Sequence, residues 1–281
     1  MRIFNRPADL SAYLESVSGK NTIGFVPTMG ALHYGHLSLL STSMKANDIT
    51  VISIFVNPTQ FNNPEDLKNY PRTLERDIEK IQALSSEIIV FAPTADDMYK
   101  GNEISETFDF DGLENQMEGK FRHGHFDGVA TIVKRLFEVV KPTNAYFGEK
   151  DFQQLQIVRR LVKKYNLPVR VIGCPIFRED NGLAMSSRNE RLSPDERKEA
   201  SIIYKTLTTA KARFGKQSVR QVAEFVEKAF GSNPKFRLEY FQIADESTLE
   251  PAIRKSKNKR YRAFIAVFVN KIRLIDTIAL N

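Results

Sequence analysis

The chain has 281 residues, which exceeds the usual size of one domain, so we expect two domains. With 42% hydrophobic and 27% charged residues, its composition is that of an ordinary globular protein and excludes a disordered or fibrous chain. No apolar run approaches the roughly 18 residues of a membrane span, and the N-terminal residues lack the apolar core of a signal peptide. With a single cysteine, Cys174, the chain cannot form an internal disulfide, which is typical of a protein in a reducing cytoplasm. Cys174 lies in an apolar run, and we expect its side chain to be buried in the fold.

The net charge of +7 is unevenly distributed along the chain. From residue 176 onward, 21 Lys and Arg stand against 13 Asp and Glu, a net of +8, whereas the first 175 residues carry 20 against 21, a net of −1. A basic C-terminal third is able to face a polyanion or the phosphates of a nucleotide. Such an excess is more often a solvated surface, and the basic segment 254–260 has the composition of an exposed loop.

Short apolar strands alternate with amphipathic helices over the first 175 residues. The expected strands are a run that begins at residue 23 and the segments 49–56, 88–91, 144–147 and 169–172. The expected helices are 7–17, one that begins near residue 35, 73–84, 128–140 and 151–165. This alternation predicts an α/β fold with a doubly wound, Rossmann-like parallel sheet, in which ligands bind beyond the carboxyl ends of the strands.

The pattern changes after about residue 175. Two helices, 194–214 and 219–230, precede strands at 236–243, 261–269 and 272–275, and Asn270-Lys271 is suited to a hairpin turn between the last two strands. We therefore expect residues 1–175 to form the Rossmann-like domain and residues 176–281 to form a smaller α+β domain.

The loop after the first strand is the strongest candidate site. It contains His33 and His36 in a His-x-Gly-His spacing, at the N-terminus of the helix that follows. A helix N-terminus offers unpaired N–H groups and a partial positive charge, and both imidazoles can donate hydrogen bonds, so the loop is suited to a phosphate. One alternative is a metal site, although no Cys or third His is nearby and zinc requires three or four ligands. The other alternative is a pair of surface histidines in an ordinary turn.

Further polar residues follow other strands of the predicted sheet. Lys150 is placed to bind a phosphate, and Asp151 to cap a helix or to bind a ribose hydroxyl. The sequence Met185-Ser186-Ser187-Arg188 is suited to triphosphate oxygens, or alternatively to a helix-capping turn. Gln60 lies in the loop after the second strand and Gln154 one helical turn beyond Lys150, so both are candidates for reading a polar substrate.

Two loops have a less specific pattern. The segment 119–128 mixes cations with glycines before a helix, which is typical of an anion site. Arg72 and Asp77 lie around the start of a helix, where an ion pair is the simpler interpretation. The chain contains neither Gly-x4-Gly-Lys-Ser/Thr nor Gly-x-Gly-x-x-Gly, so the two common phosphate-loop patterns do not apply.

The His-x-Gly-His loop and the later Met-Ser-Ser-Arg resemble the two ATP signatures of the nucleotidyltransferase superfamily that includes class I aminoacyl-tRNA synthetases. Six ordered motifs resemble, more narrowly, the pantoate–β-alanine ligase (pantothenate synthetase) family. They are Pro27-Thr28-Met29-Gly30-Ala31-Leu32-His33, Phe55-Val56-Asn57-Pro58-Thr59-Gln60-Phe61, Tyr70-Pro71-Arg72-Thr73-Leu74, Gly124-His125-Phe126-Asp127-Gly128-Val129-Ala130-Thr131, Tyr146-Phe147-Gly148-Glu149-Lys150-Asp151 and Met185-Ser186-Ser187-Arg188-Asn189. The similarity covers about residues 22–193; departures include Tyr34, Arg76 and His123, where the family usually has other residues.

The resemblance implies an ATP-dependent ligase that condenses (R)-pantoate with β-alanine through a pantoyl adenylate, in a cytoplasmic homodimer without nucleic-acid or membrane partners. It implies catalytic roles for His33, His36, Lys150, Ser186 and Arg188, pantoate binding by Gln60 and Gln154, and Mg²⁺ near Asp77. The implied ATP-binding residues are Met29, Gly30, Ala31, Leu32, His33, Tyr34, Gly35, His36, Gly148, Glu149, Lys150, Asp151, Phe177, Met185, Ser186, Ser187 and Arg188. Residues 176–281 are expected to close over ATP as a lid.

Two other functions compete with this one. A different nucleotidyltransferase, which forms a dinucleotide or charges tRNA, is able to use the same ATP signatures. A nucleic-acid-binding module is able to use the basic C-terminal third without turning over ATP.

Overall fold

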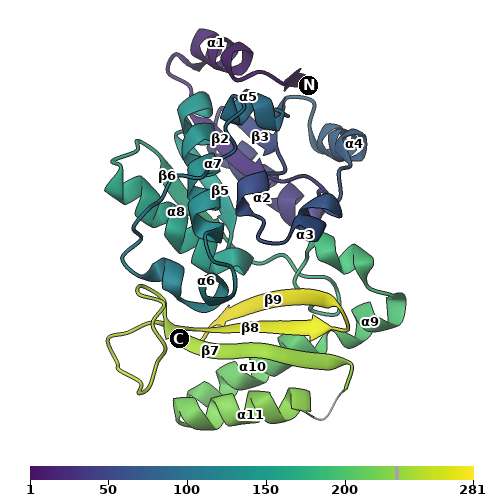
Figure 1. Ribbon diagram of the computed structural model, residues 1–281, viewed down its shortest axis with the longest axis vertical. Coiled ribbons are helices and arrows are strands. Elements are labelled where there is room, and N and C mark those ends of the chain that lie inside the picture. The colour runs from purple at the N-terminus through teal and green to yellow at the C-terminus, as the bar shows by residue number, and fades with distance from the viewer. Residues whose placement is uncertain (232–233) are drawn as a thin grey trace. The chain divides into compact units, whose positions relative to one another are not determined.

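The structure is a computed structural model that describes residues 1–231 and 234–281 (Figure 1). The chain divides into two compact units. The first unit comprises Met1–Glu114, Glu118–Gly148 and Gln154–Cys174, and the second comprises Asn115–Met117, Glu149–Gln153 and Pro175–Asn281. The segment Glu149–Gln153, which carries Lys150, therefore groups with the C-terminal part of the chain and not with the sheet that precedes it.

The first unit is built on a six-stranded sheet in the order β1-β4-β3-β2-β5-β6, and every pair of neighbouring strands is parallel. The strands are β1 (Arg2–Phe4), β2 (Ile23–Thr28), β3 (Ile49–Ile54), β4 (Ile89–Phe91), β5 (Asn144–Gly148) and β6 (Arg170–Cys174). From β2 the chain adds β3 and β4 on one side and later β5 and β6 on the other. The carboxyl ends of β2 and β5 thus flank the point where the strand order reverses, which is the usual ligand position in such sheets.

Helices connect these strands, as the alternating pattern predicts, so the α/β fold is confirmed. They are α1 (Pro7–Ser18), α2 (Tyr34–Ala46), α3 (Pro64–Lys68), α4 (Leu74–Leu84), α5 (Ala95–Tyr99), α6 (Met117–Phe121), α7 (His125–Val140) and α8 (Phe152–Lys164). The sequence does not predict β1, α3, α5 or α6, because elements of three to five residues are too short to show a periodicity.

Apolar side chains from the strands and from α2 and α4 form a core in the first unit. Val26 and Ile52 from the sheet and Leu40 and Ile81 from these helices have no exposed surface. Cys174 is buried in the same core at 4% exposure, as expected for a small apolar side chain. Removal of this apolar surface from water is the main force that holds the helices against the sheet.

The second unit carries an antiparallel sheet in the order β7-β8-β9, made of β7 (Phe236–Asp245), β8 (Tyr261–Val269) and β9 (Ile272–Ala279). Val269 pairs with Ile272 and Asn270 has a φ of +51°, so Asn270-Lys271 forms the expected two-residue hairpin. Its helices are α9 (Pro194–Glu199), α10 (Ile202–Phe214) and α11 (Val219–Gly231). The prediction of one helix over residues 194–214 was wrong, since the helix ends and restarts at residues 200–201, where neither Gly nor Pro marks a break.

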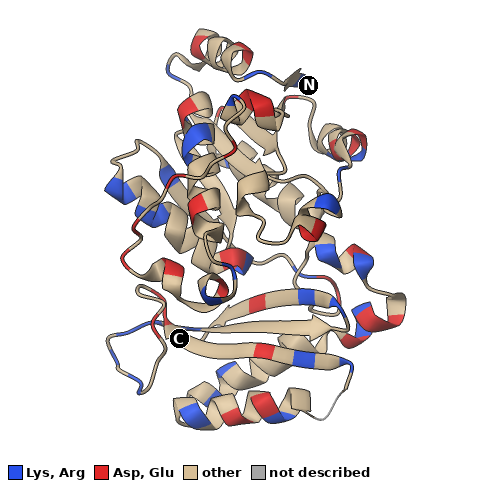
Figure 2. Ribbon diagram, in the orientation of Figure 1, with Lys and Arg blue, Asp and Glu red and all other residues tan. Residues whose placement is uncertain are grey.

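Charged residues of both signs are interspersed over the surface elements (Figure 2). The basic segment 254–260 lies in the loop between β7 and β8 and is exposed, as expected for a solvated surface. Over the part of the chain that the structure describes, we find no helix with both the length and the apolarity to cross a bilayer.

Candidate active site

The loop between β2 and α2 is held in place through its own backbone amides. Gly30 has a φ of +83° and Ala31 a φ of +49°, so the chain turns sharply through the left-handed region. The Gly30 amide donates to Thr28 Oγ1 at 3.2 Å, and the amides of Ala31 and Leu32 donate to the two carboxylate oxygens of Asp77 at 2.9 and 2.7 Å. These three amides are therefore paired within the protein and are not available as donors to a bound anion.

His33 and His36 lie together at the start of α2, where His33 is the N-cap residue. Their rings stack with centroids 4.0 Å apart and an angle of 23° between the planes. The His33 amide makes a long contact of 3.4 Å with His36 Nδ1, which accepts a hydrogen bond only when that nitrogen carries no proton. This contact favours the tautomer of His36 that carries its proton on Nε2, so the far side of the ring is a donor.

Gln60 ends a short 3₁₀ turn, Pro58–Gln60, and both ends of its side-chain amide have partners. Asn57 Nδ2 donates to Gln60 Oε1 at 3.1 Å, and Gln60 Nε2 lies 3.1 Å from Met29 Sδ. Asn57 is itself 1% exposed and accepts a hydrogen bond from the Tyr99 hydroxyl at 2.5 Å. Burial raises the pKa of Tyr99, so its hydroxyl stays protonated and remains a donor.

The start of α7 packs directly on this turn. His125 Nδ1 donates to the Gln60 carbonyl at 2.8 Å, and Asn57 Nδ2 donates to the Gly128 carbonyl at 3.1 Å. At Gly128 a Cβ atom would lie 2.5 Å from the Thr59 carbonyl oxygen, so the close approach requires glycine. The sequence suggested an anion site in residues 119–128, whereas in the structure His125 supports the backbone of Gln60.

In the second unit, the turn Glu149–Asp151 presents Lys150 beside Asp151, with Lys150 Nζ 3.2 Å from Asp151 Oδ2. Arg262 donates to Glu149 Oε2 at 3.1 Å and to Glu246 Oε1 at 2.9 Å, and its guanidinium lies 4.0 Å from the centre of the Phe152 ring. Arg262 thereby offsets part of the negative charge of Glu246 and of Glu149, which directly precedes Lys150 in the chain.

Phe177 and the Met-Ser-Ser-Arg segment are neighbours in the second unit. The Met185 amide donates to the Phe177 carbonyl at 3.0 Å, and Arg178 forms an antiparallel bridge with Ala184. Ser186 is the N-cap of the 3₁₀ helix Ser187–Arg191, where its Oγ accepts from the Arg188 amide at 3.3 Å. The capping role that the sequence suggested is therefore present, and Phe177 and Arg188 belong to one local structure.

A buried ion pair fixes this segment to the sheet of the second unit. Arg178 donates to both oxygens of Asp276 on β9, at 2.7 and 3.0 Å, and its guanidinium lies 3.7 Å from the centre of the Tyr204 ring. Burial raises the pKa of Asp276, and the Arg178 charge opposes that shift. The sequence pattern does not mark Arg178, Asp276 or Asn57, because each side chain has a partner that lies at least 42 residues away in the chain.

The predicted site residues are thus divided between the two units. The first unit holds Met29 to His36, Gln60, Asp77, Gly148 and Gln154, and the second holds Glu149 to Asp151, Phe177 and Met185 to Arg188. Within the first unit, Gln60 contacts Met29, Asp77 accepts the amides of Ala31 and Leu32, and His33 contacts His36. Gln154 lies in the first turn of α8 and is partly buried.

Asp77 does not have the surroundings of a magnesium ligand. It has no exposed surface, and both carboxylate oxygens accept amide hydrogen bonds. Among the residues of 1–231 and 234–281, no group of three or more His, Cys, Asp or Glu side chains is arranged to hold a metal ion. Mg²⁺ requires near-octahedral oxygen ligands, which these contacts do not offer. The assignment of Mg²⁺ to Asp77 stays a prediction that the hydrogen bonds do not support.

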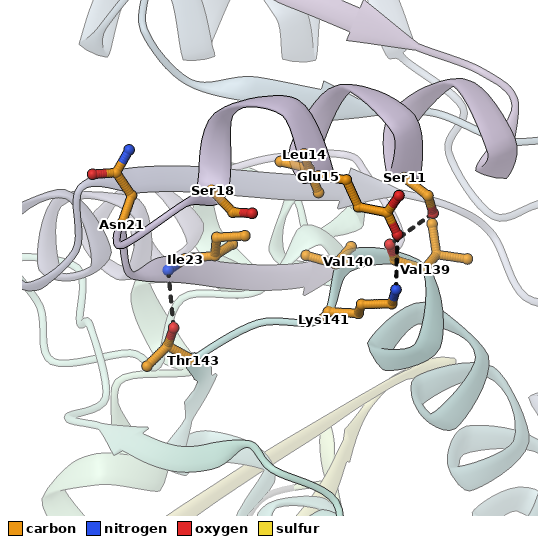
Figure 3. A pocket seen from close by; sticks show the side chains of 10 residues that line it. All are labelled: Ser11, Leu14, Glu15, Ser18, Asn21, Ile23, Val139, Val140, Lys141 and Thr143. Atoms are coloured by element: carbon orange, nitrogen blue, oxygen red, sulfur yellow. Dashed lines mark hydrogen bonds and ion pairs between the residues drawn. The ribbon is translucent and has the colours of Figure 1, made fainter.

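A cavity of about 110 Å³ lies away from these residues, at the opposite end of the strands (Figure 3). Its lining includes Ile23 at the start of β2 and Thr143 just before β5, with Ser11, Glu15 and Lys141 from neighbouring elements. The Glu15–Lys141 ion pair at its edge is largely exposed. None of the predicted site residues lines this cavity.

Comparison with known proteins shows similarity to one enzyme family over nearly the whole chain. Residues 2–279 match the family model described as Pantoate-beta-alanine ligase. The chain is 62% identical to the pantothenate synthetase of Flavobacterium psychrophilum and 55% identical to that of Christiangramia forsetii, in each case over 100% of both proteins.

Solved structures agree with the sequence relatives. The crystal structure of pantothenate synthetase from Thermus thermophilus superposes with a TM-score of 0.91 at 40% identity, covering 100% of this chain and 99% of that one. The pantoate-beta-alanine ligase of Francisella tularensis, crystallised with β,γ-ATP and β-alanine, superposes with a TM-score of 0.83 at 34% identity, covering 100% and 98%. The chain therefore belongs to the pantoate–β-alanine ligase family.

Proposed function

We propose that this chain condenses (R)-pantoate with β-alanine to form pantothenate, with ATP converted to AMP and pyrophosphate. The observation that carries the proposal is membership of the ligase family over essentially the full chain, together with the His33–His36 pair at the carboxyl end of β2. The β,γ-ATP and β-alanine in the complex of the Francisella tularensis relative correspond to two of the three substrates that this reaction needs, ATP and β-alanine.

The reaction proceeds in two steps. A carboxylate oxygen of pantoate attacks the α-phosphorus of ATP, the bond to the bridging oxygen breaks, and pyrophosphate leaves. The amine of β-alanine then attacks the acyl carbon of pantoyl adenylate, loses a proton and expels AMP. Because adenylation activates the acid, the protein needs no nucleophile of its own, and its contribution is positioning and charge stabilisation.

The residues of the first unit are assigned to the reacting groups as follows. His36, with its proton on Nε2, donates to a phosphate oxygen as negative charge develops there, and His33 contacts the same phosphates. Gln60 binds pantoate and also contacts β-alanine, and Gln154 binds pantoate. The contacts of Asn57 and Met29 with the Gln60 amide support this role, because they fix its orientation before substrate arrives.

In the second unit, Lys150, Ser186 and Arg188 are assigned to the phosphates, and Phe177 lies beside the adenine. The proximity of Phe177 to Met185 supports placing the nucleotide along this segment. Gly148, Glu149, Asp151 and Ser187 complete the ATP-binding set, with Glu149 acting through its pair with Arg262. We propose that residues 176–281 close over ATP once it binds, which is testable as a change in small-angle scattering when an ATP analogue is added.

Three further properties are proposed with the reaction. Mg²⁺ accompanies ATP through the phosphate oxygens and not through a protein carboxylate cage, which is the usual way in which this ion reaches a nucleotide site. The chain acts in the cytoplasm, as its single buried cysteine suggests. It acts as a homodimer, which sedimentation equilibrium tests directly.

The decisive experiment is a product assay in which each substrate is omitted in turn. Pantothenate should form only when ATP, pantoate and β-alanine are all present, and absence of product from the complete mixture refutes the assignment. Pyrophosphate exchange that depends on pantoate, and not on an amino acid or a mononucleotide, separates this enzyme from other nucleotidyltransferases. Salt-sensitive RNA binding without ATP turnover would favour the nucleic-acid alternative.

A further inference from the structure

Two charged side chains of α4 hold the backbone that leads into His33. Asp77 accepts the amides of Ala31 and Leu32, and Lys80, almost one turn later on the same helix, donates from Nζ to the Leu32 carbonyl at 2.6 Å. The Thr73 hydroxyl also donates to Asp77 Oδ2 at 3.3 Å. The peptide groups on both sides of Leu32 are thus fixed from one helix, more than 40 residues away in sequence.

Residues 30–32 have a backbone conformation that is unfavourable without contacts from the rest of the protein. Ala31 has a φ of +49°, which disfavours a residue with a Cβ atom, and such conformations persist where the surroundings impose them. A Cβ atom at Gly30 would lie 3.1 Å from Asp77 Oδ2, so the turn packs closely against α4 and leaves little space for a side chain there. Hydrogen bonds to a carboxylate and from an ammonium group are stronger than those between neutral groups, so Asp77 and Lys80 are suited to impose this turn.

We propose that Asp77 and Lys80 are positioning residues that set the placement of His33 and His36 for phosphate contact. His33 follows Leu32 directly, so a rotation of the Leu32 peptide displaces the N-cap of α2 and both stacked imidazoles. The inference rests on the proposed function and gives Asp77 a role different from metal binding. Neither side chain needs to touch substrate, because each acts through the loop backbone.

Lys80→Met tests the pair with little risk to folding, since Lys80 is an exposed residue and Met keeps an unbranched side chain while removing the Nζ donor. We expect kcat for pantoate-dependent pyrophosphate exchange to fall about 10- to 100-fold, because a displacement of about 1 Å in a reacting group has effects of this size. The KM for pantoate, which depends on Gln60, should stay within about twofold of wild type. Lys80→Arg, which keeps a cationic donor, should restore most of the rate.

Asp77→Asn removes one acceptor from the same backbone and should reduce kcat at least as strongly. Arg76→Met is the matched control, since it removes a charge from the adjacent position of the same helix without removing a bond to the loop. The control should retain the wild-type rate. Because Asp77 is fully buried, thermal unfolding of Asp77→Asn must show that it is folded at the assay temperature. If Asp77→Asn is unfolded at that temperature, the loss of rate in Lys80→Met tests the inference by itself.

Nuclear magnetic resonance of the imidazoles provides a readout that does not depend on activity. The ring resonances of His33 and His36 should shift in Lys80→Met and in Asp77→Asn but not in Arg76→Met. Wild-type rates and unshifted imidazoles in Lys80→Met would overturn the inference, and so would a failure of Lys80→Arg to restore the rate. If the wild-type protein makes no pantothenate, the proposed function fails, whereas the imidazole shifts still decide whether Asp77 and Lys80 position the loop.

Discussion

Replacing Gly128 with alanine should impair the enzyme more than it destabilises the fold. The added Cβ would lie 2.5 Å from the Thr59 carbonyl oxygen, 2.7 Å from the Thr59 carbonyl carbon and 2.8 Å from the α-carbon of Gln60, whereas ordinary contact begins at 3.4 Å. All three atoms are backbone, so no side chain can rotate to relieve the contact. The turn Pro58–Gln60 must instead move away from α7 by roughly 1 Å, and Gln60 moves with it.

The magnitudes separate the two effects. Overpacking of this kind costs about 1–3 kcal/mol, and the better helix propensity of alanine offsets about 1 kcal/mol of that cost. A net loss of up to about 2 kcal/mol lowers the Tm by roughly 4–8 °C and leaves a domain of ordinary stability folded at 25 °C. A displacement of roughly 1 Å at a substrate-binding amide, by contrast, is expected to lower kcat/KM for pantoate about 100-fold.

Steady-state kinetics with pantoate varied, together with thermal unfolding, measure both quantities on one preparation. Gly215→Ala is the matched control, because a Cβ there meets nothing closer than 3.9 Å and the backbone φ of −63° suits any residue. A Gly128→Ala enzyme with wild-type kcat/KM for pantoate would refute the reasoning that this glycine sets the position of Gln60. A fall in kcat/KM for ATP with no fall in kcat/KM for pantoate would show that Gln60 is not the displaced group.

Three other results are expected. Lys150→Ala and His33→Ala should each lower the rate of adenylate formation by about 100-fold or more, measured by single-turnover pyrophosphate release, because each removes a charge-stabilising group; near-wild-type rates would contradict those roles. Hydrogen bonds from the Thr22 amide and hydroxyl hold the pKa of Asp48 below its usual value, so their stabilising effect is present above the unfolded pKa and is lost as the pH falls through the folded pKa. Asp48→Asn should therefore show a smaller decrease in Tm between pH 5 and about pH 3 than wild type, and an unchanged decrease would be the contrary result. Chelation of Mg²⁺ by excess EDTA should abolish turnover without lowering the Tm, because the ion is proposed to enter with ATP; a lower Tm would indicate a site in the protein.

The sequence predicts the α/β architecture well, and the reasons are local. Strands such as β3 are rich in β-branched residues and buried along most of their length, because both faces of a parallel sheet are covered. They alternate with amphipathic helices such as α4 and α8. The hairpin at Asn270-Lys271 is equally local, since a two-residue turn needs a residue that tolerates positive φ. Elements of three to five residues are too short to show a periodic pattern. The break between α9 and α10 contains neither Gly nor Pro, so no local sequence feature predicts it.

The functions of individual side chains are harder to predict, because they depend on partners that are distant in the chain. Asp77 is an unremarkable carboxylate in a helical sequence, yet it accepts amides 45 and 46 residues away. His125 belongs to a segment that suggests an anion site, yet it supports the carbonyl of Gln60, 65 residues away. Periodicity and spacing report only on neighbours along the chain, so they predict which residue types are present at a strand end but not which of them face one another.

The amino-acid sequence by itself thus determined the order of the longer strands and helices and the presence of two imidazoles after β2, since these follow from local conformational preference and burial. Tertiary structure decided that the carboxylate of Asp77 holds a loop, that Gly128 allows α7 to approach Gln60, and that Arg178 pairs with Asp276. The physical reason is that hydrogen bonds and close contacts act over a few ångströms in space, and only the folded chain brings residues 45 to 98 positions apart within that range.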